Sequence, residues 1–171
     1  MRTLRIALLA AVATAAFAPA AMAADLILDP PAVEDQMIDN SVGWDGVYVG
    51  GLVSLQDVPS AYGAGVVIGV NATSDALLFG AELEGSWLSN NTWSAQVDGR
   101  VGALLTDSIA LYGFAGLGTN SATDGYVPVG VGAEFMVSDS VSFKTEYQYN
   151  WDFDNAAEDS NVLKAGINFH F

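Results

Sequence analysis

The clearest candidates for chemistry in this sequence are two glutamates spaced two residues apart. Glu82 and Glu84 would share one face of an extended segment, where paired carboxylates can act as general acid and base. Arg100 falls near both in the expected strand pairing and gives them a structural partner instead. The two acids belong to a larger set of charges on the same face of alternating segments: Glu82, Glu84, Asp98, Arg100, Glu134, Lys144, Glu146 and Lys164.

Nucleophilic and metal chemistry have little support. The chain has no cysteine, which excludes a thiolate metal site and a disulfide framework. Its only histidine, His170, fits a polar position at the rim of the fold better than a catalytic base. Asp152, Asp154, Glu158 and Asp159 crowd one segment and could gather divalent cations, but a solvated acidic loop is the favoured interpretation. We therefore predict no enzymatic activity, catalytic residue, cofactor or metal site.

Charge and composition exclude further classes. The 171 residues carry a net charge of −15, which argues against a nucleic-acid partner. After residue 23, no apolar run reaches the ~18 residues that a membrane-spanning helix needs. Eighteen glycines, together with abundant Val, Tyr, Phe and Trp, favour strands.

Hydrophobic residues alternate with polar ones in eight successive segments of roughly ten residues. The last segment is the clearest, with Leu163, Ala165, Ile167, Phe169 and Phe171 on one face and Lys164, Gly166, Asn168 and His170 on the other. The expected strands are 44–55, 62–72, 76–88, 93–105, 109–119, 127–135, 141–151 and 163–171. In the fifth, either Ile109, Leu111, Ala115 and Leu117 or Tyr112 and Phe114 face outward, and the first set is favoured.

The two faces decide between a barrel in lipid and a barrel in water. A soluble eight-stranded barrel of lipocalin type needs an apolar interior, and here it would bury eight ionisable side chains or expose apolar stripes. In lipid, the apolar face can point outward. An even number of strands also allows closure, which satisfies the backbone. The predicted fold is all-β, a closed eight-stranded antiparallel transmembrane β-barrel over residues 43–171.

The connections suggest an orientation. Polar turns at 73–75, 106–108 and 138–140 recur once per two strands and are typical of periplasmic turns. Pairing the strands about 90 and 139 puts Trp87 opposite Trp93 and Phe135 opposite Phe143. We expect two membrane-interface girdles, one of Trp87, Trp93, Tyr149 and Trp151 and the other of Phe79, Phe135, Phe143, Phe169 and Phe171.

The inward charges are expected to pair across strands. The same registers place Lys144 opposite Glu134, Arg100 diagonal to Glu82 and Lys164 diagonal to Glu146. The interior of an eight-stranded barrel is just filled by side chains, so these residues predict a charged plug. The alternative is a narrow cation-preferring pore that exploits the surplus of acids.

The N-terminal segments read as targeting and leader sequences. Residues 1–23 combine Arg2 and Arg5, an apolar middle and Ala21-Met22-Ala23, as in a cleavable signal peptide. Its removal leaves three basic residues against 20 acidic ones, a net charge of −17. Residues 24–42, with Pro30-Pro31, are expected to form a flexible acidic leader.

The chain resembles the small outer-membrane β-barrel family of alphaproteobacteria, which is related in architecture to the OmpA transmembrane domain. The resemblance rests on the export signal, the acidic leader, the stretch 44–51 (WDGVYVGG) and the terminal 166–171 (GINFHF), with Asp45 a mild departure. It implies a porin-like barrel in the Gram-negative outer membrane, in contact with lipid and lipopolysaccharide. It also implies delivery to the assembly machinery through a C-terminal signal containing Phe169 and Phe171.

A structural role in envelope integrity, with short acidic surface loops, is the predicted function. A small cation-preferring channel and a surface adhesin or receptor with an unknown partner are the alternatives.

Overall fold

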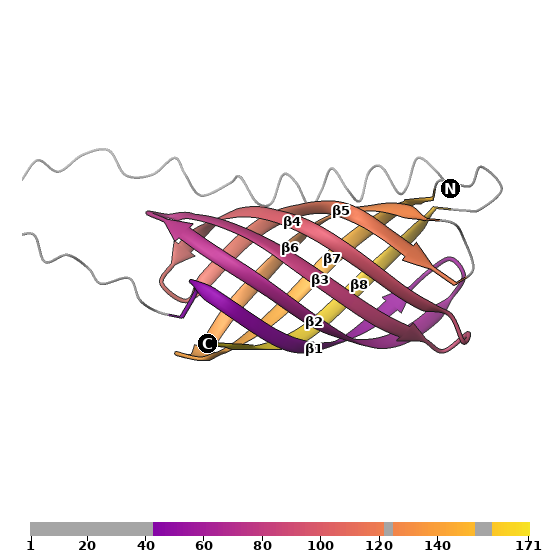
Figure 1. Ribbon diagram of the computed structural model, residues 1–171, viewed down its shortest axis with the longest axis horizontal. Helices are drawn as coiled ribbons and strands as arrows, with labels where there is room; N and C mark the ends of the chain where they lie inside the picture. The colour runs from indigo at the N-terminus through magenta and orange to yellow at the C-terminus, as the bar shows by residue number, and fades with distance from the viewer. Residues whose placement is uncertain (1–42, 122–124, 153–158) are drawn as a thin grey trace, which may run out of the picture. The chain divides into compact units, whose positions relative to one another are not determined.

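A computed structural model of the protein describes residues 43–121, 125–152 and 159–171. The predicted signal peptide and leader lie outside these residues, as do Asp154 and Glu158 of the acidic loop. All eight alternating segments are strands, with bounds close to those expected (Figure 1). They are β1 (Gly46–Gln56), β2 (Ala61–Ser74), β3 (Leu77–Leu88), β4 (Trp93–Thr106), β5 (Ile109–Asn120), β6 (Tyr126–Ser138), β7 (Val141–Asp152) and β8 (Ser160–His170).

The strands form a closed antiparallel barrel in sequence order. Each strand pairs with its neighbours along the chain, and β1 also pairs with β8 from Tyr48↔His170 to Gln56↔Val162. Closure leaves no free sheet edge, so every strand has a neighbour on both sides to which its backbone can hydrogen-bond. The predicted fold class is confirmed. No helix among the described residues is long and apolar enough to cross a membrane.

Alternation along each strand sends apolar side chains outward and polar ones inward. Val66 and Leu83 are 69% and 54% exposed on the outside, whereas Lys144 and Glu134 are each 1% exposed inside. The exterior is thus a continuous belt of Val, Leu, Ile and aromatic side chains. Such a surface suits hydrocarbon and would be unfavourable in water.

The facing of β5 follows the favoured assignment. Leu117 is 60% exposed, while Ala110, Tyr112 and Phe114 are buried in the lumen. The two rings fit because the register places glycines opposite them on β6, Gly132 beside Tyr112 and Gly130 beside Phe114. A Cβ at Gly132 would approach the Tyr112 ring to 2.5 Å, which is closer than real contacts allow.

Three two-residue turns, at 75–76, 107–108 and 139–140, lie at one end of the barrel together with the start of β1 and the end of β8 (Figure 1). We call this the turn end and the opposite one the loop end. The predicted pairings Trp87↔Trp93 and Phe135↔Phe143 are confirmed by the register. The first pair lies next to the loop end and the second next to the turn end.

The other aromatics also occupy the two ends of the exterior. Phe79, Phe169 and Phe171 are exposed towards the turn end, and Trp151 is exposed towards the loop end. The ring of Tyr149 packs edge-on against Trp151 at 5.3 Å between centroids. Their contact with a membrane interface, and the periplasmic assignment of the turns, stay predictions.

Candidate functional site

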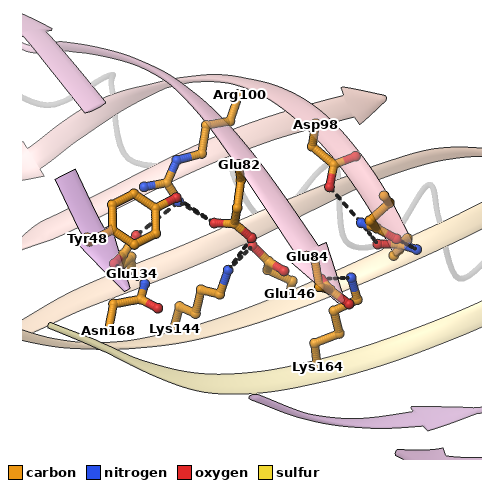
Figure 2. Close-up of polar contacts among 12 residues, drawn as sticks. Tyr48, Glu82, Glu84, Asp98, Arg100, Glu134, Lys144, Glu146, Lys164 and Asn168 are labelled. Carbon is orange, nitrogen blue, oxygen red and sulfur yellow. Dashed lines mark hydrogen bonds and ion pairs between the residues drawn. The ribbon is translucent and has the colours of Figure 1, made fainter. Parts of the chain in front are cut away.

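The lumen is organised in layers along the barrel. An apolar cluster lies at the turn end, a charged network fills the centre, and a cavity opens at the loop end. All eight predicted lumen residues point inward and are buried. Figure 2 shows the central layer, whose side chains come from β1, β3, β4, β6, β7 and β8.

The turn end is closed by an apolar cluster that we call the seal: Trp44, Leu78, Ala110 and Met136. Trp44 precedes β1, and its indole Nε1 donates a 2.8 Å hydrogen bond to the Asp107 carbonyl. Gly43 permits this path because it has a φ of +39°, and a side chain there would strike the Asp139 carbonyl. The alternation along the first strand did not predict an inward position for Trp44.

Arg100 occupies the centre of the charged network. Its guanidinium lies 4.9 Å from the ring centroids of both Tyr48 and Tyr112, within range of cation–π attraction. It donates to the Asn71 side-chain oxygen at 2.7 and 3.0 Å and to Glu134 at 3.2 Å. Glu82 lies 3.6 Å away, as the predicted diagonal suggested. A charge this deeply buried needs such a complete set of partners.

Lys144 does not form its predicted ion pair with Glu134. It is the Cα neighbour of Glu134, as expected. However, its ammonium donates to Glu82 at 2.6 Å and lies 3.4 Å from Glu146. Glu134 instead accepts hydrogen bonds from Ser142 at 2.5 Å and Asn168 at 2.8 Å, and pairs with Arg100. The lumen is narrow enough for long side chains to reach across it, so strand adjacency did not decide the pairing.

Lys164 differs from the prediction in both its register and its ion-pair partner. The register places it directly opposite Glu146, not diagonal to it. Its ammonium nevertheless pairs with Glu84, on the far side of the barrel, at 2.5 Å (Figure 2). A two-residue error in register, which keeps the side chains on the same face, was possible because the long connection between β7 and β8 does not fix their offset as a two-residue turn does.

Asp98 is the network's unpaired carboxylate. Gln96 donates to one of its oxygens at 2.6 Å. Its other oxygen has no hydrogen-bond partner among the described residues. The five carboxylates of the network face only three permanent cations, Arg100, Lys144 and Lys164.

Four inward aromatics were not predicted as parts of the site. Tyr48 donates its hydroxyl proton to Glu82 at 2.6 Å, and Tyr112 donates to Glu146 at 2.8 Å. A signal for them existed in the sequence, since each inward ring faces a glycine on a neighbouring strand. The pairs are Tyr48↔Gly69, Tyr112↔Gly132, Phe114↔Gly130 and Tyr126↔Gly118.

One constellation superficially resembles a hydrolase triad. His170 Nε2 lies 2.9 Å from the Ser142 hydroxyl and 3.5 Å from Glu134. In a working triad, serine and carboxylate bind different ring nitrogens. Here both contact Nε2, the Ser142 hydroxyl donates to Glu134, and Ser142 is fully buried. The arrangement positions no nucleophile for a substrate.

Three carboxylates also approach each other closely enough to ligate a metal. Oxygens of Glu82, Glu84 and Glu146 lie within 4.8 Å of one another. The ammonium groups of Lys144 and Lys164 already contact all three acids. These lysines supply the positive charge that a metal ion would otherwise provide.

At the loop end the lumen widens into a cavity of about 320 Å³. Glu84, Gln96, Gln148 and Lys164 line it deep in the barrel, and Asn90 and Asp152 line it towards the mouth. Gln96 and Gln148 exchange amide hydrogen bonds at 3.1 and 3.2 Å. The cavity is thus separated from the turn end by the charged network and the seal.

No protein-family model matches this chain, and no curated protein matches it in sequence. Its fold is similar to those of solved membrane barrels. A de novo designed transmembrane β-barrel has a TM-score of 0.55 at 21% identity, covering 73% of this chain and 94% of its own. The outer-membrane enzyme PagL has a TM-score of 0.59 at 11% identity, covering 72% and 99%. Neisserial surface protein A has a TM-score of 0.52 at 19% identity, covering 73% and 96%. Likeness at these identities establishes the fold and no shared activity.

Proposed function

We propose that this protein is a structural barrel of the Gram-negative outer membrane that contributes to envelope integrity with its lumen plugged. The supporting observation is the two-layer obstruction of the lumen. The central network brings charged side chains from opposite walls to within 2.5–3.6 Å of one another. Behind it the seal fills the turn end with apolar side chains. An ion would have to displace both layers to pass.

The remaining parts of this role rest on the sequence pattern and the exposed belt. Export would use the signal peptide 1–23, and insertion would use the assembly machinery through the last strand, with Phe169 and Phe171 exposed near its end. Lipid would cover the apolar exterior, and lipopolysaccharide would contact the loop end. The kinship with alphaproteobacterial, OmpA-related barrels belongs to this proposal.

A non-enzymatic role is also proposed. One of the structural neighbours, PagL, is described as an enzyme. In this chain, however, the single histidine contacts Ser142 and Glu134 through the same ring nitrogen. Both partners are buried in the lumen near the turn end. A substrate would find no exposed nucleophile–base pair that includes this histidine.

A cation-preferring channel is the second candidate, because the network holds five carboxylates against three permanent cations. A role as adhesin or receptor is less well supported. The described loops at 57–60 and 89–92 are short and offer little area for a protein partner.

Conductance across a planar lipid bilayer tests the proposal. The refolded protein should show the folded band in a heat-modifiable gel assay and leave the bilayer electrically silent. A pore-forming porin inserted by the same procedure controls for incorporation. Discrete cation-selective steps that change with Glu134→Gln would reject the plug and support the channel.

A further inference from the structure

The loop-end cavity is a feature of the lumen that the plug does not explain. Every strand except β2 contributes lining residues, and the loops at 57–60 and 89–92 add more. β2 faces the space with Gly63 and Gly65, over which the Ser54 and Ser86 hydroxyls lie. Because the side chains on facing walls are small, they leave the interior of the barrel unfilled at this end. Its volume of about 320 Å³ is at the lower limit of ordinary small-ligand pockets, which range over ~300–1,000 Å³.

Twelve of the 19 lining residues carry uncharged hydrogen-bonding side chains. Hydroxyls and side-chain amides can each donate and accept, so they suit a ligand whose own groups do both. The lining includes Ser54, Gln56, Ser86, Asn90, Thr92 and Asn150. Carboxylates and ammonium groups, which recognise charged ligands, are represented by only three lining residues, Glu84, Asp152 and Lys164.

The two charged residues at the inner end of the cavity, which we call its floor, offset each other's charge. Glu84 and Lys164 pair at 2.5 Å, and their side chains are 5% and 3% exposed. Ser86 donates to the other Glu84 oxygen at 2.8 Å. Gln148 binds Gln96 and also donates to Asn150 at 2.6 Å. The floor is thus held in place before any ligand arrives, which lowers the entropic cost of binding.

We propose that this cavity binds an uncharged, hydroxyl-rich compound the size of a single sugar ring or a disaccharide. Anions are disfavoured because the lining carries one more carboxylate than ammonium and the chain as a whole has a net charge of −15. A divalent cation would need several free oxygen ligands, whereas Glu84 is already paired. Pro59, Leu88 and Val162 supply apolar surface for the C–H faces of a sugar.

This ligand site goes beyond the structural role, since binding at the mouth requires no conduction through the plug. An eight-stranded barrel interior has room for one small ligand where its side chains are short. The cavity and the plug also share a boundary at Glu84 and Lys164, so a ligand would rest directly on the network.

The test is saturation-transfer NMR on the refolded protein in phosphatidylcholine nanodiscs, because glycoside detergents carry competing sugar headgroups. The probes are maltose, lactose and trehalose, with glucose 6-phosphate compared against glucose for the effect of charge. A matched pair of variants places the site. Ser86→Phe fills the cavity, whereas Gly85→Phe adds the same ring one residue away on the exterior, where a Cβ has nothing within 4 Å. Heat-modifiable migration confirms that both variants fold.

We expect transfer to at least one neutral disaccharide at millimolar concentration, retained in Gly85→Phe and weakened at least tenfold in Ser86→Phe. Gln56→Ala, which removes one lining amide, should weaken it less and serves if Ser86→Phe does not fold. Absence of transfer to all three disaccharides would overturn the proposal. So would equal transfer in Ser86→Phe and Gly85→Phe, or tighter binding of glucose 6-phosphate than of glucose. The conductance experiment tests the plug independently of these binding measurements. Either proposal can therefore be rejected without rejecting the other.

Discussion

At the scale of single residues, the desolvation cost of the buried charges is offset because several charged side chains each contact more than one partner. Arg100 contacts two carboxylates, one amide and two aromatic rings, and Glu82 in turn contacts Lys144 and Tyr48. Breaking one member of such a set leaves its partners buried and unsatisfied. The loss then exceeds the value of any single contact.

Lys144→Ala should lower the free energy of unfolding by about 3–5 kcal/mol, because Glu82 and Glu146 would both lose their ammonium partner. Urea unfolding in lipid vesicles, followed by tryptophan fluorescence, measures the change. Thr145→Ala, one residue away on the exterior, is the matched control and should change stability by about 0.5 kcal/mol or less. Equal stability of the two variants would mean that the network does not hold the barrel together.

Arg100→Lys keeps the charge but loses the planar fork that binds Asn71 and the cation–π contacts to Tyr48 and Tyr112. We expect a loss of about 2–4 kcal/mol from one or two hydrogen bonds and the ring contacts. The same urea titration measures it. Wild-type stability in Arg100→Lys would show that position 100 needs only a positive charge.

At the scale of strands, the sequence was most informative where alternation and turn length act together. Two short connections, the loop at 89–92 and the two-residue turn at 139–140, fixed the registers that bring Trp87 to Trp93 and Phe135 to Phe143. The partners of Lys144 and Lys164 were not predictable, because long side chains select among acids across the whole lumen. These choices depend on closure of the barrel, which pairwise strand reasoning does not represent.

Pro128 is an element-level feature that alternation alone does not reveal. It lies inside β6, and the β5–β6 pairing runs to Ala115↔Val129 and resumes only at Gly118↔Tyr126. Proline has no N–H to donate, so the ladder is interrupted there. Similarly, register shifts occur beside two of the turns, between Leu104 and Thr106 and between Met136 and Ser138.

The facing of β6 gives a depth-dependent prediction. Val131 lies mid-strand on the exterior, and Val127 lies on the same face near the loop end. An arginine at the bilayer midplane costs about 2–4 kcal/mol and near the interface about 0–1 kcal/mol. Val131→Arg should therefore destabilise the barrel in phosphatidylcholine vesicles more than Val127→Arg, by about 2–3 kcal/mol. Identical costs at the two positions would count against a bilayer centred on the middle of β6.

At the scale of the whole molecule, the seal and the network obstruct the lumen in series. Trp44→Ala should open the turn end yet leave the bilayer silent, because Arg100 and its partners still fill the centre. Adding Arg100→Ala should produce cation-selective current, since five network carboxylates would then face two lysines. Current from Trp44→Ala alone would show that the network is permeable and the seal is the gate.

The pairing of β1 with β8 also governs how the barrel folds. Tyr48 pairs with His170, and the rings of Trp44 and Tyr48 pack against His170 at 6.2 and 5.3 Å between centroids. These contacts join residues near opposite ends of the strand-forming chain, and loop-closure entropy makes such pairings slow. Until β8 pairs with β1, the first strand has an unpaired edge. An intermediate that lacks β8 would expose both β1 and β7 to aggregation, so folding of this protein should depend on a chaperone that covers those edges.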